Sequence, residues 1–424
     1  MGSTARIVQL ASLIASQTAA INDYLDDHEL PTPSFSLDTL DSPGIPSGAA
    51  DIQAAKASVI SACSELKDLL TGPRSLLKCP WTDYVSVKAI LRFKLDQSFE
   101  VGSSTDFKKM SEFSGLNERN VRRIVRHGII NHRFFREDEP GVITHSALTA
   151  ILVQDQAARN SLVVELDEFW PAGVHMADAM EQWPNSEECN ETGFTVANHT
   201  TKSMYDFFAD HPDRGERFAR YFSKPEPVAT ADEILDNYEW AGKQKVVDVG
   251  GSHGAVAIGI ARRFPAIQCV VQDLPGPVAE GESRLPKDLK DRVTFMAHDF
   301  FKPQPVEADV YFFRSIFHNW PDKYCIKILQ NLVPVLKTGA RIIIHERVLP
   351  GLEKLDTVDA MRAINLDVGM QQLLNAQQRE LHEWPGLFRS ADPRFHYVGA
   401  YHPEGAIRWI IEAEWRDEET GGTA

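Results

Sequence analysis

Apolar residues recur at helical spacing through the first part of the chain. This pattern predicts one helix over residues 5–29 and a second over residues 51–71. The stretch between them, residues 31–50, is rich in proline and glycine, which is typical of a linker. We therefore expect residues 1–50 to form a helix-and-linker arm ahead of the first folded domain.

The pattern changes after the second helix, where short amphipathic segments precede polar, alternating sequence. Residues 107–115 and 116–127 predict two helices joined by a turn, and residues 129–144 alternate like two strands with Glu139-Pro140-Gly141 between them. This order is typical of a winged helix. We predict that residues 51–152 form a helical, winged-helix domain whose use is dimerisation.

Residues 153–228 are predicted to be helical and contain many aromatic and methionine side chains. Most of these side chains are expected to form core, since apolar residues at helical spacing usually do. A minority could line a pocket for an aromatic substrate, so we interpret this stretch as a substrate lid.

From residue 244 onward, short apolar runs alternate with helical patterns. Such runs are typical of parallel strands covered on both faces, so residues 229–415 predict an α/β domain with a Rossmann-like, doubly wound sheet. The expected strands are residues 245–249, 269–272, 293–297, 309–313 and 341–345, and the expected helices are residues 255–264, 277–281 with an extension, and 324–336. The polar, glycine-rich residues 416–424 are predicted to be a disordered tail.

Charge and cysteine content narrow the possible partners. The 424 residues include 44 basic and 60 acidic side chains, a formal net charge of −16. Such a field repels phosphate backbones, so nucleic acid is not an expected partner, although four arginines of the second predicted helix of the winged region could contact DNA. The five cysteines are scattered without a CxxC pair, which fits a reducing compartment without disulfides or structural zinc. No apolar run is long enough for a membrane span and no signal peptide is recognisable, so we expect a cytoplasmic protein without a membrane partner.

The strongest chemical signal lies at the end of the first predicted strand of the α/β domain. The sequence Asp248-Val249-Gly250-Gly251 begins a strand-to-helix turn, where glycines allow a ligand to approach the backbone. Asp273 follows the next strand, where a carboxylate can accept both ribose hydroxyls of a nucleoside. A carboxylate at Asp248 would repel a pyrophosphate but would favour the ammonium of a methionine moiety. These residues therefore indicate S-adenosylmethionine rather than a dinucleotide.

Three further strand ends carry candidate groups. Asp299 and Phe300 could bind and stack on adenine after the third strand. His318 follows the fourth strand, at the sheet edge where doubly wound folds place ligands, and a neutral imidazole there can act as a general base. Glu346 follows the fifth strand and could hold that imidazole in one tautomer.

In this order, these motifs resemble the class I S-adenosylmethionine-dependent O-methyltransferases of the caffeic-acid and flavonoid type, especially their relatives in fungal secondary metabolism. The resemblance covers residues 80–415. It implies an interlocked homodimer, a small-molecule substrate and a mechanism that needs no metal. It assigns cofactor binding to Asp248, Gly250, Gly251, Asp273, Leu274, Asp299, Phe300 and Arg314, and catalysis to His318 with Glu346 as its carboxylate partner.

The sequence departs from that family beside the predicted base. Where the family has a second carboxylate, alignment places Gln378, and Glu380 lies two residues further on and is the other candidate to assist His318. This departure keeps an alternative open: some fungal proteins on the same scaffold bind S-adenosylmethionine for pericyclic or dehydration chemistry without transferring its methyl group. Because His318 and Glu346 are both present, methyl transfer to a hydroxyl of a small aromatic or polyketide-type molecule is the favoured prediction. His132, His175 and His199 are left without an assigned role.

Overall fold

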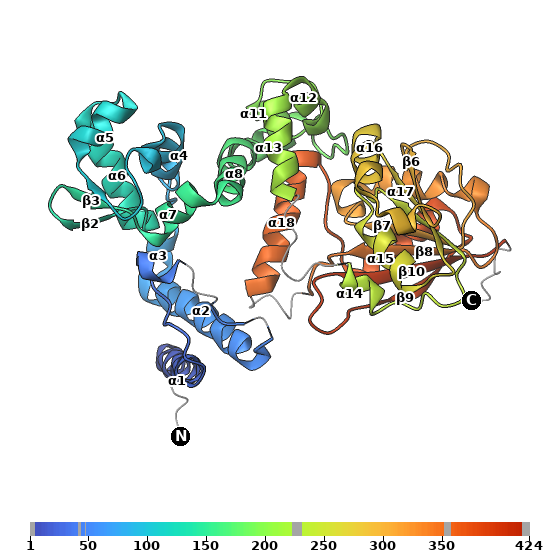
Figure 1. Ribbon diagram of the computed structural model, residues 1–424, viewed down its shortest axis with the longest axis horizontal. Coiled ribbons are helices and arrows are strands. Elements are labelled where there is room, and N and C mark those ends of the chain that lie inside the picture. The colour runs from blue at the N-terminus through green and yellow to red at the C-terminus, as the bar shows by residue number, and fades with distance from the viewer. Residues whose placement is uncertain (1–4, 41–43, 47, 223–230, 352–357, 418–424) are drawn as a thin grey trace. The chain divides into compact units, whose positions relative to one another are not determined.

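The computed structural model describes residues 5–40, 44–46, 48–222, 231–351 and 358–417, which fall into two compact units (Figure 1). The first unit falls within Met1–Trp170, Glu216–Tyr221 and Asp356–Asp359. The second falls within Pro171–Gly215, Phe222–Leu355 and Ala360–Ala424. The finer domain boundaries given above stay predictions, and most of the predicted tail, residues 418–424, lies outside the described residues.

The first unit begins with the two predicted helices, α1 (Arg6–Asp27) and α2 (Ala50–Thr71). They pack against each other and are joined by an ion pair between Arg6 and Glu65 at 2.6 Å. Between them lies one short 3-10 helix, η1 (Leu37–Thr39), and α3 (Pro73–Leu76) follows. Only a few side chains of α1 and α2 are buried, so much of their apolar surface stays exposed.

The middle of the first unit combines three helices with a small antiparallel sheet. The helices are α4 (Val85–Arg92), α5 (Phe107–Ser114) and α6 (Glu118–His132), and the strands, in the order β1-β3-β2, are β1 (Ser104–Thr105), β2 (Arg136–Glu139) and β3 (Val142–Thr144). The strand expected from residue 129 is wrong at its start, because α6 continues to His132 and buries Gly128 against α4. The winged-helix interpretation remains a prediction.

The arginine-rich face of α6 is occupied by carboxylates of its own unit. Arg122 pairs with Glu118 one turn away, and Arg126 pairs with Glu137 of β2, each at 2.6 Å. Both guanidinium groups also lie over the ring of Phe107. These contacts favour the interpretation of this charge run as a solvated, internally paired face.

The helical character predicted for residues 153–228 is confirmed over the residues that are described. Phe194 packs edge-to-face with Phe207 and Phe208 at centroid distances of 5.5 and 5.6 Å, so these aromatic side chains form core. The elements are α7 (Ala147–Gln154), α8 (Gln156–Val164), a π-helical turn η3 (Glu165–Phe169), α9 (Trp170–Val174), α10 (Met176–Gln182), α11 (Gly193–Ala197), α12 (Met204–Asp210) and α13 (Pro212–Phe222).

The second unit is built on a seven-stranded sheet with the order β6-β5-β4-β7-β8-β10-β9. The five predicted strands are present and parallel: β4 (Lys245–Val249), β5 (Gln268–Asp273), β6 (Val293–Ala297), β7 (Val310–Arg314) and β8 (Arg341–Glu346). Two antiparallel strands that the sequence analysis missed, β9 (Phe395–Tyr401) and β10 (Trp409–Trp415), extend the sheet beyond β8. The α/β fold class is confirmed.

Helices cover both faces of this sheet (Figure 1). They are α14 (Asp232–Leu235), α15 (Ala255–Arg263), α16 (Pro275–Arg284), α17 (Asp322–Gln330) and α19 (Trp384–Ala391), with 3-10 turns η4 (Lys287–Leu289) and η6 (Val333–Val335). A further helix, α18 (Val358–Leu374), precedes α19 along the chain. The helix expected over residues 324–336 is wrong at its end: α17 stops at Gln330, and η6 contains Pro334, which cannot donate a helical N–H bond.

Strand order reverses at β4, which lies between β5 and β7. Val247, Phe313 and Ile344 are buried on one face of the sheet, and Val246, Val271 and Phe312 on the other, so the strands are fixed from both sides. A doubly wound sheet binds ligands at the carboxyl ends of its strands beside such a switch point. No helix among the described residues is long and apolar enough to cross a membrane.

Candidate active site

The turn between β4 and α15 requires glycine at two successive positions. Gly250 has a φ of +72°, and a Cβ added there would lie 2.5 Å from the side chain of Ile316. A Cβ at Gly251 would lie 2.6 Å from the carboxyl carbon of Asp248. Both backbone N–H groups donate to the carbonyl of Gln272, at 2.8 and 3.1 Å. The turn is therefore bound to the end of β5 and exposes bare backbone beside Ile316.

Asp248 lies beneath this turn and is almost fully buried, at 2% exposure. Burial raises the pKa of its carboxyl to about 7, although the charge of Arg314 and a hydrogen bond from the Ala257 backbone act in the opposite direction. Because this buried carboxyl is only partly ionised near pH 7, a positive charge placed close to it would stabilise the ionised form. Arg314 itself ends β7 and is half-buried.

Asp273 ends β5 and connects two segments of the site. Its Oδ2 accepts the N–H of Ser252 at 2.8 Å, and its Oδ1 accepts the N–H of Leu274 at 2.7 Å. The carboxylate therefore faces the glycine turn, where sequence reasoning expected it. Leu274 follows with 59% of its surface exposed, which leaves an apolar side chain next to this acid.

Asp299 and Phe300 lie just beyond β6, at the same edge of the sheet. Asp299 Oδ1 accepts the N–H of Phe301 at 2.9 Å, which fixes the loop. The ring of Phe300 lies 4.9 Å from that of Phe301 and 6.0 Å from that of Trp320, centroid to centroid. A Cβ at Gly250 would also reach Phe300, at 4.0 Å. The structure thus brings Phe300 beside the glycine turn.

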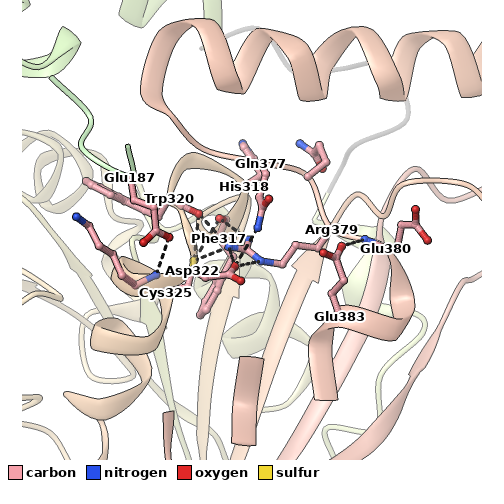
Figure 2. A network of polar contacts seen from close by, with 12 residues as sticks. Glu187, Phe317, His318, Trp320, Asp322, Cys325, Gln377, Arg379, Glu380 and Glu383 are labelled. Carbon is pink, nitrogen blue, oxygen red and sulfur yellow. Dashed lines mark hydrogen bonds and ion pairs between the residues drawn. The ribbon is translucent and has the colours of Figure 1, made fainter. Parts of the chain in front are cut away.

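His318 and Glu346 meet as the sequence analysis expected. His318 lies in a short 3-10 helix, η5 (Phe317–Asn319), and its Nδ1 is 2.7 Å from Oε2 of Glu346, the last residue of β8. Glu346 Oε1 also accepts the backbone N–H groups of Phe317 at 2.8 Å and His318 at 3.4 Å. One carboxylate therefore binds both the ring and the backbone of the turn that carries it (Figure 2 shows the surroundings of His318).

The charge state of Glu346 determines what the imidazole can do. Burial at 1% exposure acts to raise its pKa, but the charge of His318 and hydrogen bonds from the His318 ring and backbone, with the charge of Arg408, hold that pKa below its usual value. An ionised carboxylate can only accept a hydrogen bond, so the proton between the two groups belongs on Nδ1 of His318. Nε2 then carries the free lone pair of the ring.

The two candidates to assist His318 differ in their surroundings. Gln378 is 4% exposed, and in the described part of the chain its side-chain amide has no hydrogen-bond partner. Glu380 begins the 3-10 helix η8 (Leu381–Glu383), where it exchanges capping hydrogen bonds with Glu383. Its carboxylate also pairs with His382 at 3.2 Å. The Glu380 carboxylate is therefore used in local capping and pairing contacts. The Gln378 amide is buried and could still form hydrogen bonds.

Sequence reasoning missed Arg379, a buried arginine that binds the turn carrying His318 (Figure 2). Its only signal was its place in the segment that departs from the family pattern. The histidines left unassigned lie elsewhere: His132 pairs with Asp83, and His175 with Asp178. No group of three or more potential metal ligands occurs among the described residues.

Comparisons with known proteins identify relatives that match nearly the whole chain. Residues 175–392 match the family model of an O-methyltransferase domain. The chain is 36% identical over 98% of its length to the grayanic acid biosynthesis cluster O-methyltransferase of Cladonia grayi, covering 89% of that protein. It is also 36% identical over 97% of its length to the O-methyltransferase AMT9 of Alternaria alternata, covering 98% of it.

Solved structures share the fold at lower identity. OxaC in complex with sinefungin and meleagrin aligns at a TM-score of 0.73 and 20% identity, covering 97% of this chain and all of that one. LepI in complex with S-adenosylmethionine aligns at 0.65 and 18% identity, covering 96% of this chain and all of LepI. At these identities the likeness extends to the fold alone.

Proposed function

Because this chain belongs to the S-adenosylmethionine-dependent O-methyltransferase family, we propose that His318 is its general base and Glu346 the carboxylate that orients it. The observation that carries this assignment is the 2.7 Å contact between His318 Nδ1 and Glu346 Oε2. It commits Nδ1 to donating and leaves Nε2 to accept a proton from an incoming hydroxyl. The ring is 19% exposed, so Nε2 can be reached by a substrate.

The proposed reaction is transfer of a methyl group to a substrate oxygen. When bound, S-adenosylmethionine would supply the methyl group from its positively charged sulfur, and that sulfur would keep the bonding electron pair in S-adenosylhomocysteine. Nε2 of His318 takes the hydroxyl proton while the oxygen forms its bond to the methyl carbon. The ionised Glu346 stabilises the imidazolium that results. The rest of the rate enhancement comes from holding the oxygen in line with the methyl group.

We assign cofactor binding to a set of residues because they all lie at the carboxyl edge of the parallel strands. Gly250 and Gly251 allow the methionine part to approach the backbone, and the carboxylate of Asp273 binds the ribose hydroxyls. The side chains that would hold the adenine are Leu274, Asp299 and Phe300. The buried Asp248, with Arg314 beside it, favours the cation, since a positive charge above the turn stabilises its ionised form.

The proposed substrate is a small aromatic or polyketide-type molecule with a free hydroxyl. Its support is the aromatic pair Phe300 and Trp320, whose ring centroids lie 6.0 Å apart on the segments that follow β6 and η5. On α18 the side chains of Met361 and Ile364 are exposed, and Asp367 of the same helix accepts the N–H of Gln378 at 2.6 Å. The helix that carries these exposed apolar side chains is thus hydrogen-bonded to Gln378, a candidate to assist the proposed base.

The test is a methyl-transfer assay with phenolic and polyketide-type acceptors that counts S-adenosylhomocysteine against product. One molecule of each is expected per turnover. His318→Ala should lower kcat by about 10²–10⁴-fold with cofactor affinity unchanged. Full activity of that variant would remove the base assignment. Product formed without S-adenosylhomocysteine would instead support the pericyclic alternative, which the named relatives do not favour.

We also propose that the first unit forms a homodimer. Its support is a set of apolar side chains that are exposed on that unit: Ile60, Leu69, Leu70, Leu76, Leu77 and Trp81. Exposed apolar side chains in such number often mark an interface. Leu77→Glu, at a side chain 86% exposed, should convert a dimer into a monomer by light scattering, and Phe113→Glu on α5 is the matched control. A wild-type monomer at micromolar concentration would refute the dimer.

The five cysteines are all free thiols, at least two of them exposed. Exposed thiols persist in a reducing compartment, so we place the enzyme in the cytoplasm. Fractionation of cells that express the tagged chain would test this placement.

A further inference from the structure

Arg379 connects the two chain segments that carry the proposed base and its carboxylate. Its backbone forms a parallel bridge with Val348, and its carbonyl accepts the N–H of Leu349 at 3.0 Å. Those residues lie two and three positions after Glu346. Its side chain, 1% exposed, runs to the opposite segment, the turn η5 and the residues that follow it. A single residue therefore binds both of the segments that carry the His318–Glu346 pair.

The guanidinium group binds the carbonyls on either side of His318. Nη1 donates to the carbonyl of Phe317 and Nη2 to that of Trp320, each at 3.0 Å (Figure 2). Phe317 immediately precedes the histidine, and Trp320 follows it by two residues. The Phe317 carbonyl also accepts the N–H of Trp320 at 3.2 Å, which closes the turn, and the two bonds from Arg379 bind that turn at both of its ends. They therefore help to fix the backbone from which the imidazole projects.

An acidic side chain holds the guanidinium in place. Asp322 Oδ1 accepts from Nε at 3.0 Å and from Nη2 at 2.7 Å, and it also accepts from Nε2 of Gln377 at 3.0 Å (Figure 2). Nη2 is in addition 3.3 Å from the sulfur of Cys325, on α17. These four acceptors, two carbonyl oxygens, one carboxylate oxygen and one sulfur, lie around the planar fork of arginine, which a single ammonium group does not reproduce.

We propose that Arg379 is a positioning residue that holds His318 against Glu346. This proposal rests on the proposed function, since it concerns the same histidine. Arg379 does not touch the substrate or the methyl group. It acts by keeping the turn η5 in register with the end of β8, so that the ring meets its carboxylate at hydrogen-bond distance. Small misplacements of a proton acceptor are costly, since a shift of about 1 Å can lower a rate by about 10²-fold.

The experiment compares Arg379→Met with a matched buried arginine. Arg159, in the other unit, is 8% exposed and pairs with Asp96, so Arg159→Met removes a buried arginine without touching η5. Rates are divided by the concentration of sites that bind the cofactor, so that unfolded protein is not counted. On this basis Arg379→Met should lower kcat by about 10–10²-fold, with KM and cofactor affinity within about threefold of wild type. Arg379→Lys, which keeps the charge but not the fork, should recover only part of the loss. Arg159→Met should keep the wild-type kcat.

A second readout separates this proposal from the base assignment. The Nδ1 proton of His318 should give a downfield proton NMR signal, assigned by its absence in His318→Ala. Arg379→Met should shift or broaden that signal, whatever its effect on catalysis. An unchanged signal and unchanged kcat would overturn the positioning role, whereas wild-type activity of His318→Ala would overturn only the base role.

If Arg379→Met does not fold, Asp322→Asn tests the same contact. Asp322 is half exposed, so its amide should be tolerated. Asparagine keeps an accepting oxygen but removes its negative charge, so the bonds from the guanidinium weaken and kcat should fall by about 3–10-fold with KM unchanged. Wild-type kcat in both Asp322→Asn and Arg379→Lys would refute the proposal.

Discussion

The two sides of the proposed active site are assembled in different ways. On the cofactor side, the backbone N–H groups of Gly250 and Gly251 donate to the carbonyl at the end of β5, and the N–H of Ser252 donates to the carboxylate of Asp273. On the proton-transfer side, His318 depends on Glu346 and Arg379, which lie 28 and 61 residues further along the chain. The first arrangement follows from strand pairing, whereas the second depends on side chains that meet only in the folded unit.

This difference predicts how each side fails. A substitution on the cofactor side should change binding and leave the rest of the site intact, because backbone bonds hold the turn. A substitution on the proton-transfer side should change kcat through its neighbours, because each side chain orients the next. The following predictions test that contrast, from the largest expected effect to the smallest.

Glu346→Gln should lower kcat by about 10²-fold, because an amide does not stabilise the imidazolium. In a His318→Ala background the same change should lower kcat by less than about threefold, since there is no ring to orient. Steady-state kinetics on the four proteins of this cycle measure the coupling. Equal effects in both backgrounds would mean that the two residues act independently. That result would contradict the proposed difference between the cofactor side and the proton-transfer side.

The same variant has a signature in stability. The pKa of Glu346 is lowered on folding, so its ionised form stabilises the protein above the unfolded value near pH 4.5, and this contribution is lost as the pH falls. Glu346→Gln should therefore be less stable than wild type at pH 7, and the difference should shrink as the pH approaches 4. Thermal unfolding at both pH values checks the sign.

Asp248→Asn should change how stability depends on pH. Because the pKa of Asp248 is raised to about 7, the folded protein keeps a proton between about pH 4 and 7 that the unfolded chain has lost. Wild-type stability from this group is therefore complete below about pH 4 and falls as the pH rises toward 7, by roughly 2 kcal/mol between pH 5 and 7. Urea unfolding of the cofactor-free Asn variant should show a flatter profile. A slope equal to that of wild type would mean that Asp248 titrates normally.

Asp273→Asn should raise the dissociation constant for S-adenosylmethionine by about tenfold, by weakening hydrogen bonds to the ribose. Asp309→Asn is a matched control, because Asp309 Oδ2 also accepts two backbone N–H groups, those of Gln244 at 2.7 Å and Lys245 at 2.9 Å, but at the amino end of β4. Calorimetry should find wild-type affinity in the control. Equal weakening in both variants would mean that the loss is structural.

Prediction from sequence succeeded where local pattern and strand pairing suffice. The five parallel strands follow from short apolar runs, and the place of Asp273 follows from its position at the end of β5. The antiparallel strands β9 and β10 were missed, although residues 411–415 alternate between apolar and polar, because the pairing of β10 with β8 depends on contacts distant in sequence. The true end of α17 was also missed, although Pro334 was present as a signal.

The sequence by itself determined the α/β class, the glycine turn and the residue types at each strand end, because these depend on periodicity and on backbone geometry that neighbouring residues dictate. Only the tertiary structure decided that Asp248 is buried, that Glu380 is occupied by a local cap, and that Arg379 binds the turn of His318. Burial, charge and the partner of a side chain depend on segments far away in the chain. Residue type and spacing alone do not contain that information.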